Sequence, residues 1–584
     1  MLKKAAVVVL LCIGVLGANG ATIVKRNLSA AKQKMLETAL PDERRIADAP
    51  KGSGVPLGEV PAMRTLLGTY TGITGFFDYQ TNAGACQFIR VDPSNPTGNL
   101  IHVIMMEATD SLAPTGPTRG TYYVYSTNAG VTWNSFSSLR VPSRRSGYPS
   151  LSLLQGSTQG TIIANHNDAG TGNATYVYVD SPPGSGAFAE IGTPPAISGG
   201  ADEPIWPVAV GAADGSIVVN ASRSTANTDW RSRTTDFVTW DPWTEITPSA
   251  SAGIPTKANT TGRVGCLMNS TFASNTGIFF IESTNSGATW PATASLLVPL
   301  NRIAGPDTFQ YTLGSDLVYN GDNLNIAFAE TNVDVSVPTD SAQITFWSAA
   351  TGFVAAATKK NTTGVAAFEH LATLNTITMD MPSIGLSGSA IVIAYHAMME
   401  NDTSLNGYNC SDIFMVSSAN GGLTWSAPRN LSQSPGLDDR FVSVSPWNPP
   451  GFVNLVWQED TQAGGNIIAD PGATINRTQQ KFLRTAITGI GEGNTQPASF
   501  SLGQNYPNPF NPSTVIDYTV AQPGRVMLKV YNTLGQEVAT ILNEQMQPGS
   551  YQATFNASSL SSGIYYYTMT TGSFSETKKM LLMK

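Results

Sequence analysis

Six side chains that could bind a polar ligand recur at similar points of a repeating strand pattern. Arginines and aromatic residues stand at or near the start of a first strand, and one histidine stands near the end of a second strand. These candidates are Arg145, Tyr148, Trp206, Arg263, His396 and Arg440. Guanidinium groups bind carboxylates through two parallel hydrogen bonds, and aromatic rings stack on sugars. The set indicates a site for a polar ligand such as an anionic sugar, and it identifies no catalytic residue.

The elements that would position these residues are pairs of apolar strands joined by tight turns. Residues 205–222, IWPVAVGAADGSIVVNAS, form one such pair, and residues 381–399, MPSIGLSGSAIVIAYHAMM, form another. Turn dipeptides such as Asp214-Gly215 are typical of hairpins. About seven units follow one another at intervals of roughly 40 to 70 residues, which is the spacing of propeller blades. Residues 65–488 are therefore predicted to form an all-β, six- or seven-bladed β-propeller.

In such a propeller the starts of the first strands and the ends of the second strands share one face. We expect the six candidates to meet there, around the central channel. Loop ends are also polar wherever a propeller face is solvated, so the same pattern fits a surface without a ligand. Both interpretations stay open on the sequence.

One eight-residue turn occurs three times, each time after an alternating apolar run. The copies are STNAGVTW at 126–133, STNSGATW at 283–290 and SANGGLTW at 418–425. They resemble the Asp-box (BNR repeat) S-x-D-x-G-x-T-W, with Asn in place of Asp. The resemblance implies a turn between the third and fourth strands of a blade, in which the Asx side chain caps backbone amides, Gly supplies the positive φ and Trp packs between blades. The residues concerned are Ser126, Asn128, Gly130, Trp133, Ser283, Asn285, Gly287, Trp290, Ser418, Asn420, Gly422 and Trp425.

Asp boxes occur in sialidases and in noncatalytic propellers, so the turn itself is predicted to be structural. Sialidases also use an arginine in an (F/Y)RIP motif ahead of the first box, and residues 76–88, FFDYQTNAGACQF, contain no arginine. Two functions remain: a noncatalytic propeller that binds glycan or protein ligands, and a sialidase-like glycoside hydrolase. The first is preferred, because the arginine motif is missing.

Composition excludes several other classes. The net charge of −8 and the charged fraction of 13% argue against a nucleic-acid-binding protein, which needs a basic face. Cys86, Cys266 and Cys410 are far apart and fit buried thiols better than disulfides or a CxxC site. The motifs HExxH, GxSxG and DxDxDG are missing. No metal and no cofactor are predicted.

The N-terminus has the pattern of an export signal. Lys3 and Lys4 precede the apolar run AAVVVLLCIGVLG, and Ala18-Asn19-Gly20 supplies small residues for cleavage. Residues 1–20 are predicted to be a signal peptide, and residues 21–64, the charge-dense stretch that follows, a leader or pro-segment. No transmembrane anchor is expected in the mature chain.

The last module begins after a polar linker at 489–499. Strands in residues 500–584 alternate apolar and polar side chains between Pro-Gly and Leu-Gly turns, which predicts a small β-sandwich. The module resembles the type A C-terminal sorting domain of the type IX secretion system. That resemblance implies recognition by the outer-membrane translocon and a secreted or cell-surface location, reached through the periplasm. The matching residues include Asn505, Tyr506, Pro507, Asn508, Pro509, Phe510, Gly535 and Gly563.

Overall fold

The computed structural model describes residues 68–583, apart from 81–85, 135–138, 156–159, 169–172, 198–201, 224, 227, 249–254, 336–340, 364–377, 466, 468–472, 488–499, 506–507, 521–523, 547–548 and 573. The predicted signal peptide (1–20), the leader (21–64), the linker (489–499) and Tyr506 and Pro507 lie outside the described residues. Within them the regular secondary structure consists of strands and one short helix, α5 (Lys359–Thr362).

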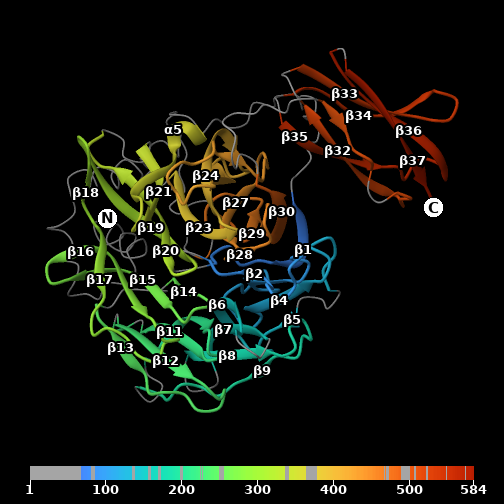
Figure 1. Ribbon diagram of the computed structural model, residues 1–584. Coiled ribbons are helices and arrows are strands. Elements are labelled where there is room, and N and C mark those ends of the chain that lie inside the picture. The colour runs from blue at the N-terminus through green and yellow to red at the C-terminus, as the bar shows by residue number, and fades with distance from the viewer. Residues whose placement is uncertain are drawn as a thin grey trace, which may run out of the picture. The chain divides into compact units, whose positions relative to one another are not determined.

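The chain divides into two compact units between residues 490 and 491. The described part of the first unit contains seven antiparallel sheets of four or five strands, arranged in chain order around one axis (Figure 1). The first unit is therefore a seven-bladed β-propeller, within the predicted range of six or seven.

Each blade begins with an inner strand and is built outward. Blade 1 contains β2 (Ile89–Val91), β3 (Ile101–Glu107), β4 (Gly120–Ser126) and β5 (Leu139–Arg140). Blade 2 contains β6 (Ser146–Leu153), β7 (Thr161–Asp168), β8 (Asn173–Asp180) and β9 (Ala189–Glu190). Blade 3 contains β10 (Ile205–Gly211), β11 (Ile217–Arg223), β12 (Thr228–Thr234) and β13 (Thr244–Ile246). Blade 4 contains β14 (Thr256–Ala258), β15 (Val264–Phe272), β16 (Asn275–Ser283) and β17 (Ser295–Pro299).

Blades 5 and 6 have five strands each, and blade 7 has four. Blade 5 contains β18 (Arg302–Ala304), β19 (Asp307–Asn320), β20 (Asn323–Asn332), β21 (Ala342–Ser348) and β22 (Gly352–Thr358). Blade 6 contains β23 (Met379–Ser387), β24 (Ala390–Thr403), β25 (Asn409–Ser418), β26 (Arg429–Asn430) and β28 (Trp447–Asn448). Blade 7 contains β27 (Asp438–Val444), β29 (Phe452–Asp460), β30 (Thr478–Ala486) and the N-terminal strand β1 (Thr69–Gly75). Because β1 pairs antiparallel with β30, the first described strand closes the ring.

Inner strands face the channel with one edge, so their backbone N–H groups need partners outside their own sheet. Serines supply several of them. Ser150 Oγ accepts a hydrogen bond from Ala209 N of the next blade at 3.1 Å, and Ser383 Oγ accepts one from Val444 N at 3.0 Å. Ser443 Oγ accepts one from the N–H group of Phe88, in front of β2, at 3.0 Å. These bonds join consecutive blades and fix the inner strands around the axis.

Four bulky residues near the starts of inner strands have left-handed backbone conformations. They are Tyr148 (φ 49°), Trp206 (φ 55°), Met381 (φ 51°) and Phe441 (φ 55°). In each case the pairing of the inner strand with the second strand shifts register at that residue, which is a β-bulge. A bulky residue with positive φ costs on the order of 1 to 3 kcal/mol and persists only where the surrounding structure fixes it.

The three repeated turns, called here the Ser-Asn turns (126–133, 283–290 and 418–425), have one geometry. In the first, Gly130 N donates to Ser126 Oγ at 2.9 Å, and Thr132 N donates to Asn128 Oδ1 at 2.9 Å. The equivalent bonds of Asn285 and Asn420 are 2.9 and 3.0 Å long. Each Asn therefore caps its own turn.

The tryptophans of these turns are half-buried rather than buried, and each contacts the preceding blade. Trp133 lies against Phe482 of blade 7 with ring centroids 5.1 Å apart, and Trp425 lies against Phe346 of blade 5 at 5.2 Å. Trp290 packs under Arg231 of blade 3 at 4.8 Å. The turns are joints between blades, and their chemistry is structural.

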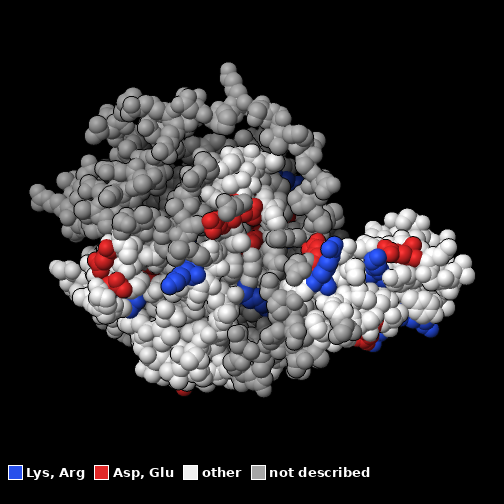
Figure 2. Space-filling view, turned by 90° about the horizontal axis from the view of Figure 1, so that it is seen from above, with Lys and Arg blue, Asp and Glu red and all other residues white. Residues whose placement is uncertain are grey.

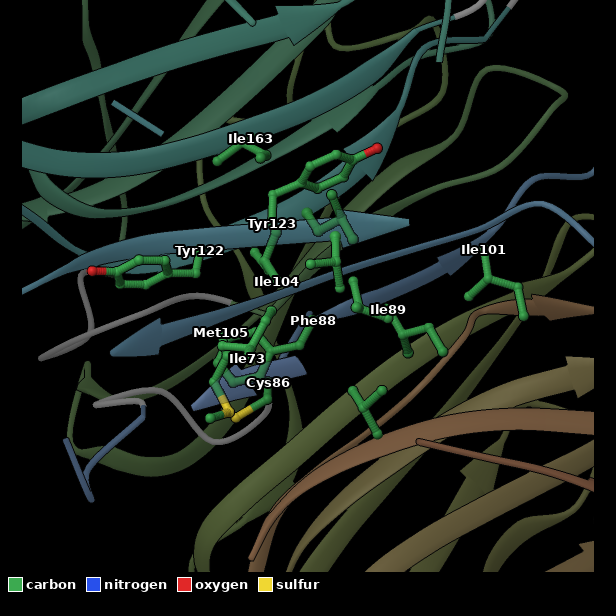
Figure 3. Packing of buried hydrophobic residues seen from close by; sticks show 14 of the residues in the cluster. Ile73, Cys86, Phe88, Ile89, Ile101, Ile104, Met105, Tyr122, Tyr123 and Ile163 are labelled. Atoms are coloured by element: carbon green, nitrogen blue, oxygen red, sulfur yellow. The ribbon is translucent and has the colours of Figure 1, made fainter. Parts of the chain in front are cut away.

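The largest apolar cluster fills the space between blades 7, 1 and 2. It includes Ile104 and Tyr123 of blade 1 and Ile163 of blade 2, all fully buried (Figure 3). Cys86, in the same cluster, is a free thiol, as are the buried Cys266 and Cys410. Separate cores lie between the other blades, so each interface is packed by apolar side chains from both sides.

The second unit is built from two sheets with one apolar core between them. One sheet contains β31 (Ser501–Leu502), β32 (Ser513–Val520) and β35 (Gly549–Asn556). The other contains β33 (Gly524–Tyr531), β34 (Glu537–Met546), β36 (Gly563–Thr571) and β37 (Phe574–Leu582). This is the small β-sandwich predicted from the alternating strands.

The asparagine-proline motif anchors the start of this sandwich to its core. Asn505 Nδ2 donates to Thr514 Oγ1 at 2.9 Å, and Asn508 Oδ1 accepts from Leu581 N at 2.9 Å. Phe510 is buried in the core. Gly535 has φ 75° in the turn before β34, and Gly563 begins β36. The described residues of this motif therefore have structural roles.

Candidate ligand-binding site

The starts of the inner strands and the ends of the second strands lie at one end of the channel, called here the mouth. The Ser-Asn turns follow third strands and lie at the opposite end. At the mouth, Tyr148 of blade 2 and Trp206 of blade 3 meet edge to face, with centroids 6.4 Å apart and planes at 88°. Both rings are half-buried, so each keeps surface for a ligand.

Two further aromatic residues extend this cluster toward blade 7. Tyr79 lies 6.5 Å from Tyr148 and 6.2 Å from Phe441 between centroids, edge to face in both cases. Tyr79 comes from the segment before β2, and Phe441 comes from the bulge of β27. Side chains from four parts of the ring thus form one aromatic row.

Two guanidinium groups lie beside this row. Arg119 Cζ lies 5.9 Å from the centroid of Tyr148, and its Nε donates to Ser146 O at 3.2 Å. Arg145 Nε donates to Thr115 O at 3.1 Å. Burial, and then Arg119 and Arg145, lower the pKa of His166 to about 3. His166, whose ring centroid lies 5.4 Å from that of Tyr148, is therefore neutral at physiological pH.

Arg440 and His396 lie on the blade 6 and blade 7 side of the mouth. Arg440 forms an ion pair with Asp438, and both side chains are buried. Burial lowers the pKa of His396 to about 3, and the positive charge of Arg440 adds to this shift. His396 therefore stays uncharged beside Arg440.

A small pocket opens next to Arg440. It is lined by Asp78, Asp438, Arg440, Phe441, Gln458, Asp460 and Gly464. Burial raises the pKa of Asp460 to about 8, and the neighbouring Asp78 acts in the same direction. At neutral pH Asp460 can therefore hold a proton that it could donate to a ligand.

The channel does not run open through the propeller, because side chains bridge it. Gln87 Nε2 of blade 1 donates to Thr256 O of blade 4 at 3.1 Å, and Arg90 donates to Gln87 Oε1 at 2.8 Å. Lys257 Nζ lies 3.4 Å from Asp316 Oδ1, and both side chains are buried. The Gln87 bond joins blades 1 and 4 across the channel, and the Lys257 ion pair joins the neighbouring blades 4 and 5.

The expected position of Arg263 at the mouth was wrong. The inner strand of blade 4 is the short Thr256–Ala258, so Arg263 stands at the turn between the first and second strands, at the end of the Ser-Asn turns. There Gly262 O accepts a hydrogen bond from Ser286 N at 2.7 Å, and Arg263 forms ion pairs with Glu282 and Asp322. Of the six candidates, the structure places Arg145, Tyr148 and Trp206 in one group and His396 and Arg440 in another, both at the mouth.

Sequence reasoning did not select Tyr79 or Arg119. Both stand in connecting segments, where no strand periodicity marks them. Arg119 does have a signal: it directly precedes the third strand GTYYVYS, and the loop between second and third strands lies at the same end as the mouth.

Among the described residues, no group of three or more His, Cys, Asp or Glu side chains has the arrangement of a metal site. On the described surface in view in Figure 2, acidic and basic residues are interspersed, without the broad basic face of a nucleic-acid-binding protein. The mouth combines an aromatic row with ionisable side chains and is therefore the candidate site of the described propeller.

Comparison with known families identifies the second unit. Residues 504–583 match the family described as the secretion system C-terminal sorting domain. The second unit is a type IX sorting domain. The protein is therefore exported, and its location is secreted or at the cell surface. No helix within the described residues is long and apolar enough to cross a membrane.

The chain is also similar in structure to proteins that act on polysaccharides. An ulvan lyase of polysaccharide lyase family PL25 matches with a TM-score of 0.40 and 10% identity, over 71% of this chain and 96% of that chain. A protein of unknown function from Dyadobacter fermentans matches with 0.34 and 12%, over 70% and 97%. An arabinoxylan arabinofuranohydrolase of glycoside hydrolase family 43 from Bacillus subtilis matches with 0.31 and 10%, over 86% and 96%. No curated protein matches in sequence. At these scores the likeness assigns no activity to this chain.

Proposed function

We propose that the exported propeller binds a glycan at its mouth, with the sugar rings stacked on the aromatic row of Tyr79, Tyr148 and Trp206. The main support for this proposal is a bulge that recurs in three inner strands. It places Tyr148, Trp206 and Phe441 at equivalent positions, and each of these residues has positive φ. Strained backbone clusters at functional sites, because the strain has no benefit to folding. Exposed aromatic faces beside arginines suit a sugar with polar substituents.

A glycan array screened with the mature exported protein tests this proposal. Bound glycans are then titrated against Trp206→Ala, Tyr148→Ala and the control Phe353→Ala, whose aromatic ring lies on the outer strand of blade 5. Stacking of a ring on an aromatic side chain contributes about 1 to 3 kcal/mol, so either mouth variant should weaken binding about tenfold or more. Equal binding by all four proteins, or no bound glycan, would overturn the proposal.

A second candidate function is glycoside hydrolysis in the small pocket. Asp460 is protonated at neutral pH, and Asp78 lines the same pocket beside Arg440. Glycoside hydrolases use two carboxyl groups, one of which donates a proton to the leaving group. Tyr–Glu hydrogen bonds of the kind expected for a sialidase nucleophile occur among the described residues at Tyr70, Tyr178 and Tyr319, and none of these tyrosines lines the pocket. The observation therefore favours a carboxyl-pair hydrolase over a sialidase.

Sugar release from the glycans found on the array tests this candidate. Wild type should release reducing sugar, and Asp460→Asn and Asp78→Asn should each reduce the rate at least a hundredfold if these residues are acid and base. Binding without any release by wild type leaves the noncatalytic function as the conclusion.

A further inference from the structure

Two neighbouring arginines at the mouth, Arg119 and Arg145, form no ion pair with a described Asp or Glu. Arg119 is almost completely buried, with 6% of its surface exposed, and it packs over the rings of Phe77 and Tyr148. The pKa of Arg119 is lowered to about 10, mainly by burial and to a lesser extent by the neighbouring positive charge of Arg145. Arg119 also donates to Ser146 O, next in the chain to Arg145, so the two arginines are neighbours at the mouth.

Among the described residues, the hydrogen bonds of Arg119 and Arg145 reach only backbone oxygens. Arg119 donates to Ser146 O, and Arg145 donates to Thr115 O. Neither side chain forms an ion pair with a described Asp or Glu. A buried guanidinium without a counter-charge is unfavourable, because its lost hydration is not replaced.

Other arginines of the same propeller do have acidic partners. Arg144, next in the chain to Arg145, lies 2.8 Å from Glu190. Arg223 pairs with Asp202, and Arg233 pairs with Asp214. Arg140 and Arg484 also bond only to backbone oxygens, so the distinguishing feature of the mouth pair, Arg119 and Arg145, is that two such arginines lie beside the aromatic row.

The imidazole of His166, next to the pair, adds no positive charge. His166 has its pKa lowered to about 3 and is neutral. Its Nδ1 accepts a hydrogen bond from Trp206 N at 3.4 Å, which holds the imidazole against the aromatic row. None of the described residues that contact the pair carries a carboxylate.

We infer that Arg119 and Arg145 form an anion subsite that receives the carboxylate or sulfate group of an acidic polysaccharide. This inference rests on the proposed function and names its substrate class. A sugar ring stacked on Tyr148 would place its acidic substituent over the guanidinium of Arg119, which lies 5.9 Å from the same ring. The anion would offset the repulsion between the arginines, and this gain is absent for a neutral sugar.

The test uses the mature exported protein and three polymers that differ in charge: polygalacturonate for carboxylate, dextran sulfate for sulfate, and unmodified dextran. Affinities are measured by titration at 50 and 300 mM NaCl for wild type, Arg145→Gln, Arg119→Gln and the control Arg144→Gln. Arg145 is half-exposed, so its variant stays informative if loss of the buried Arg119 prevents folding.

The expected result is that at least one acidic polymer binds tenfold or more tightly than dextran, with weaker binding at high salt. Arg145→Gln and Arg119→Gln should remove that preference, and Arg144→Gln should keep it. The polymer that shows the preference identifies the group as carboxylate or sulfate. Two results overturn the anion subsite and leave the proposed function intact. One is equal binding of acidic and neutral polymers that Trp206→Ala weakens. The other is an acidic preference that Arg145→Gln retains. Binding of no polymer overturns the anion subsite, whereas the proposed function is judged by the glycan array.

Discussion

Tyr148 and Trp206 occupy the same position in neighbouring blades, and their rings meet edge to face at 6.4 Å. Both have positive φ, and both precede a proline, Pro149 and Pro207. The residue before a proline is already restricted, and a bulky residue with positive φ is rare. Two rings held in this way are fixed before any ligand arrives, which reduces the ordering cost of binding.

A Gly variant is usually less stable than an Ala variant at the same position, and the backbone conformation at Trp206 predicts the opposite order of stability. At φ 55°, Gly has no Cβ penalty, and an L-residue there costs about 1 to 2 kcal/mol. Trp206→Gly should therefore be about 1 kcal/mol more stable than Trp206→Ala. The control is Ile205, the preceding half-buried residue without positive φ, where Ala should be more stable than Gly. Urea unfolding measures all four variants, and the same ranking at both positions would contradict a strained bulge.

The Ser-Asn turns predict a stability loss without any loss of binding. Asn285 Oδ1 accepts from Thr289 N at 2.9 Å, and Asn285→Ala removes that acceptor. The free energy of unfolding should fall by about 0.5 to 2 kcal/mol, as for a lost helix cap. Asn285→Asp keeps the acceptor and should be near wild type. An Ala variant as stable as the Asp variant would show that the cap contributes nothing.

Gly130→Ala should cause a larger loss of stability than Asn285→Ala, because both the backbone conformation and the packing disfavour a side chain at this position. Its φ is 82°, and a Cβ would lie 2.0 Å from Phe482 Cε1. Overpacking costs typically about 1 to 3 kcal/mol, to which the backbone strain adds. Gly130→Ala should thus lower stability by more than about 2 kcal/mol in urea unfolding. Gly321→Ala has similar backbone strain but no atom within 4 Å of the added Cβ, so it should cost clearly less.

The sequence was sufficient to predict the structural features that repeat along the chain. Three copies of one turn predicted the turns of three of the seven blades, and strand alternation predicted the strands of both units. Asn128, Asn285 and Asn420 cap their turns as expected because an Asx cap depends on neighbours within four residues.

Features that depend on a single short strand or on distant loops were not predictable. Arg263 was misplaced because the inner strand of its blade has only three residues and shows no apolar run. Tyr79 and Arg119 were missed because their neighbours at the mouth come from other blades. The positive φ at Phe441 has no local sequence signal, since Phe441, unlike Tyr148, Trp206 and Met381, is not followed by proline.

The sorting domain predicts a separation of folding from export. The chain divides between residues 490 and 491, and each unit has its own apolar core. Deletion of residues 500–584 should leave a propeller that melts cooperatively, retained in the periplasm. Cell fractionation with immunoblotting measures the location, and circular dichroism of the purified fragment measures folding. Normal amounts of the truncated protein outside the cell would contradict the role of this domain.

The pocket beside Arg440 predicts a pH dependence of stability. The pKa of Asp460 is about 8 in the folded protein, raised mainly by burial, against about 4 in an unfolded chain. Between these values the folded state holds one proton more than the unfolded state, so stability falls as pH rises. Asp460→Asn removes this titration and keeps an oxygen that can accept from Gln462 N, which donates to Asp460 Oδ1 at 2.9 Å.

The stability of wild type relative to Asp460→Asn should therefore decrease between pH 5 and pH 8, with a slope of up to about 1.4 kcal/mol per pH unit. Other buried acids titrate in both proteins, so the difference isolates Asp460. Urea unfolding at pH 5, 6.5 and 8 gives the three differences. A constant difference would mean that Asp460 is ionised in the fold, and it would remove the proton that glycoside hydrolysis in this pocket requires.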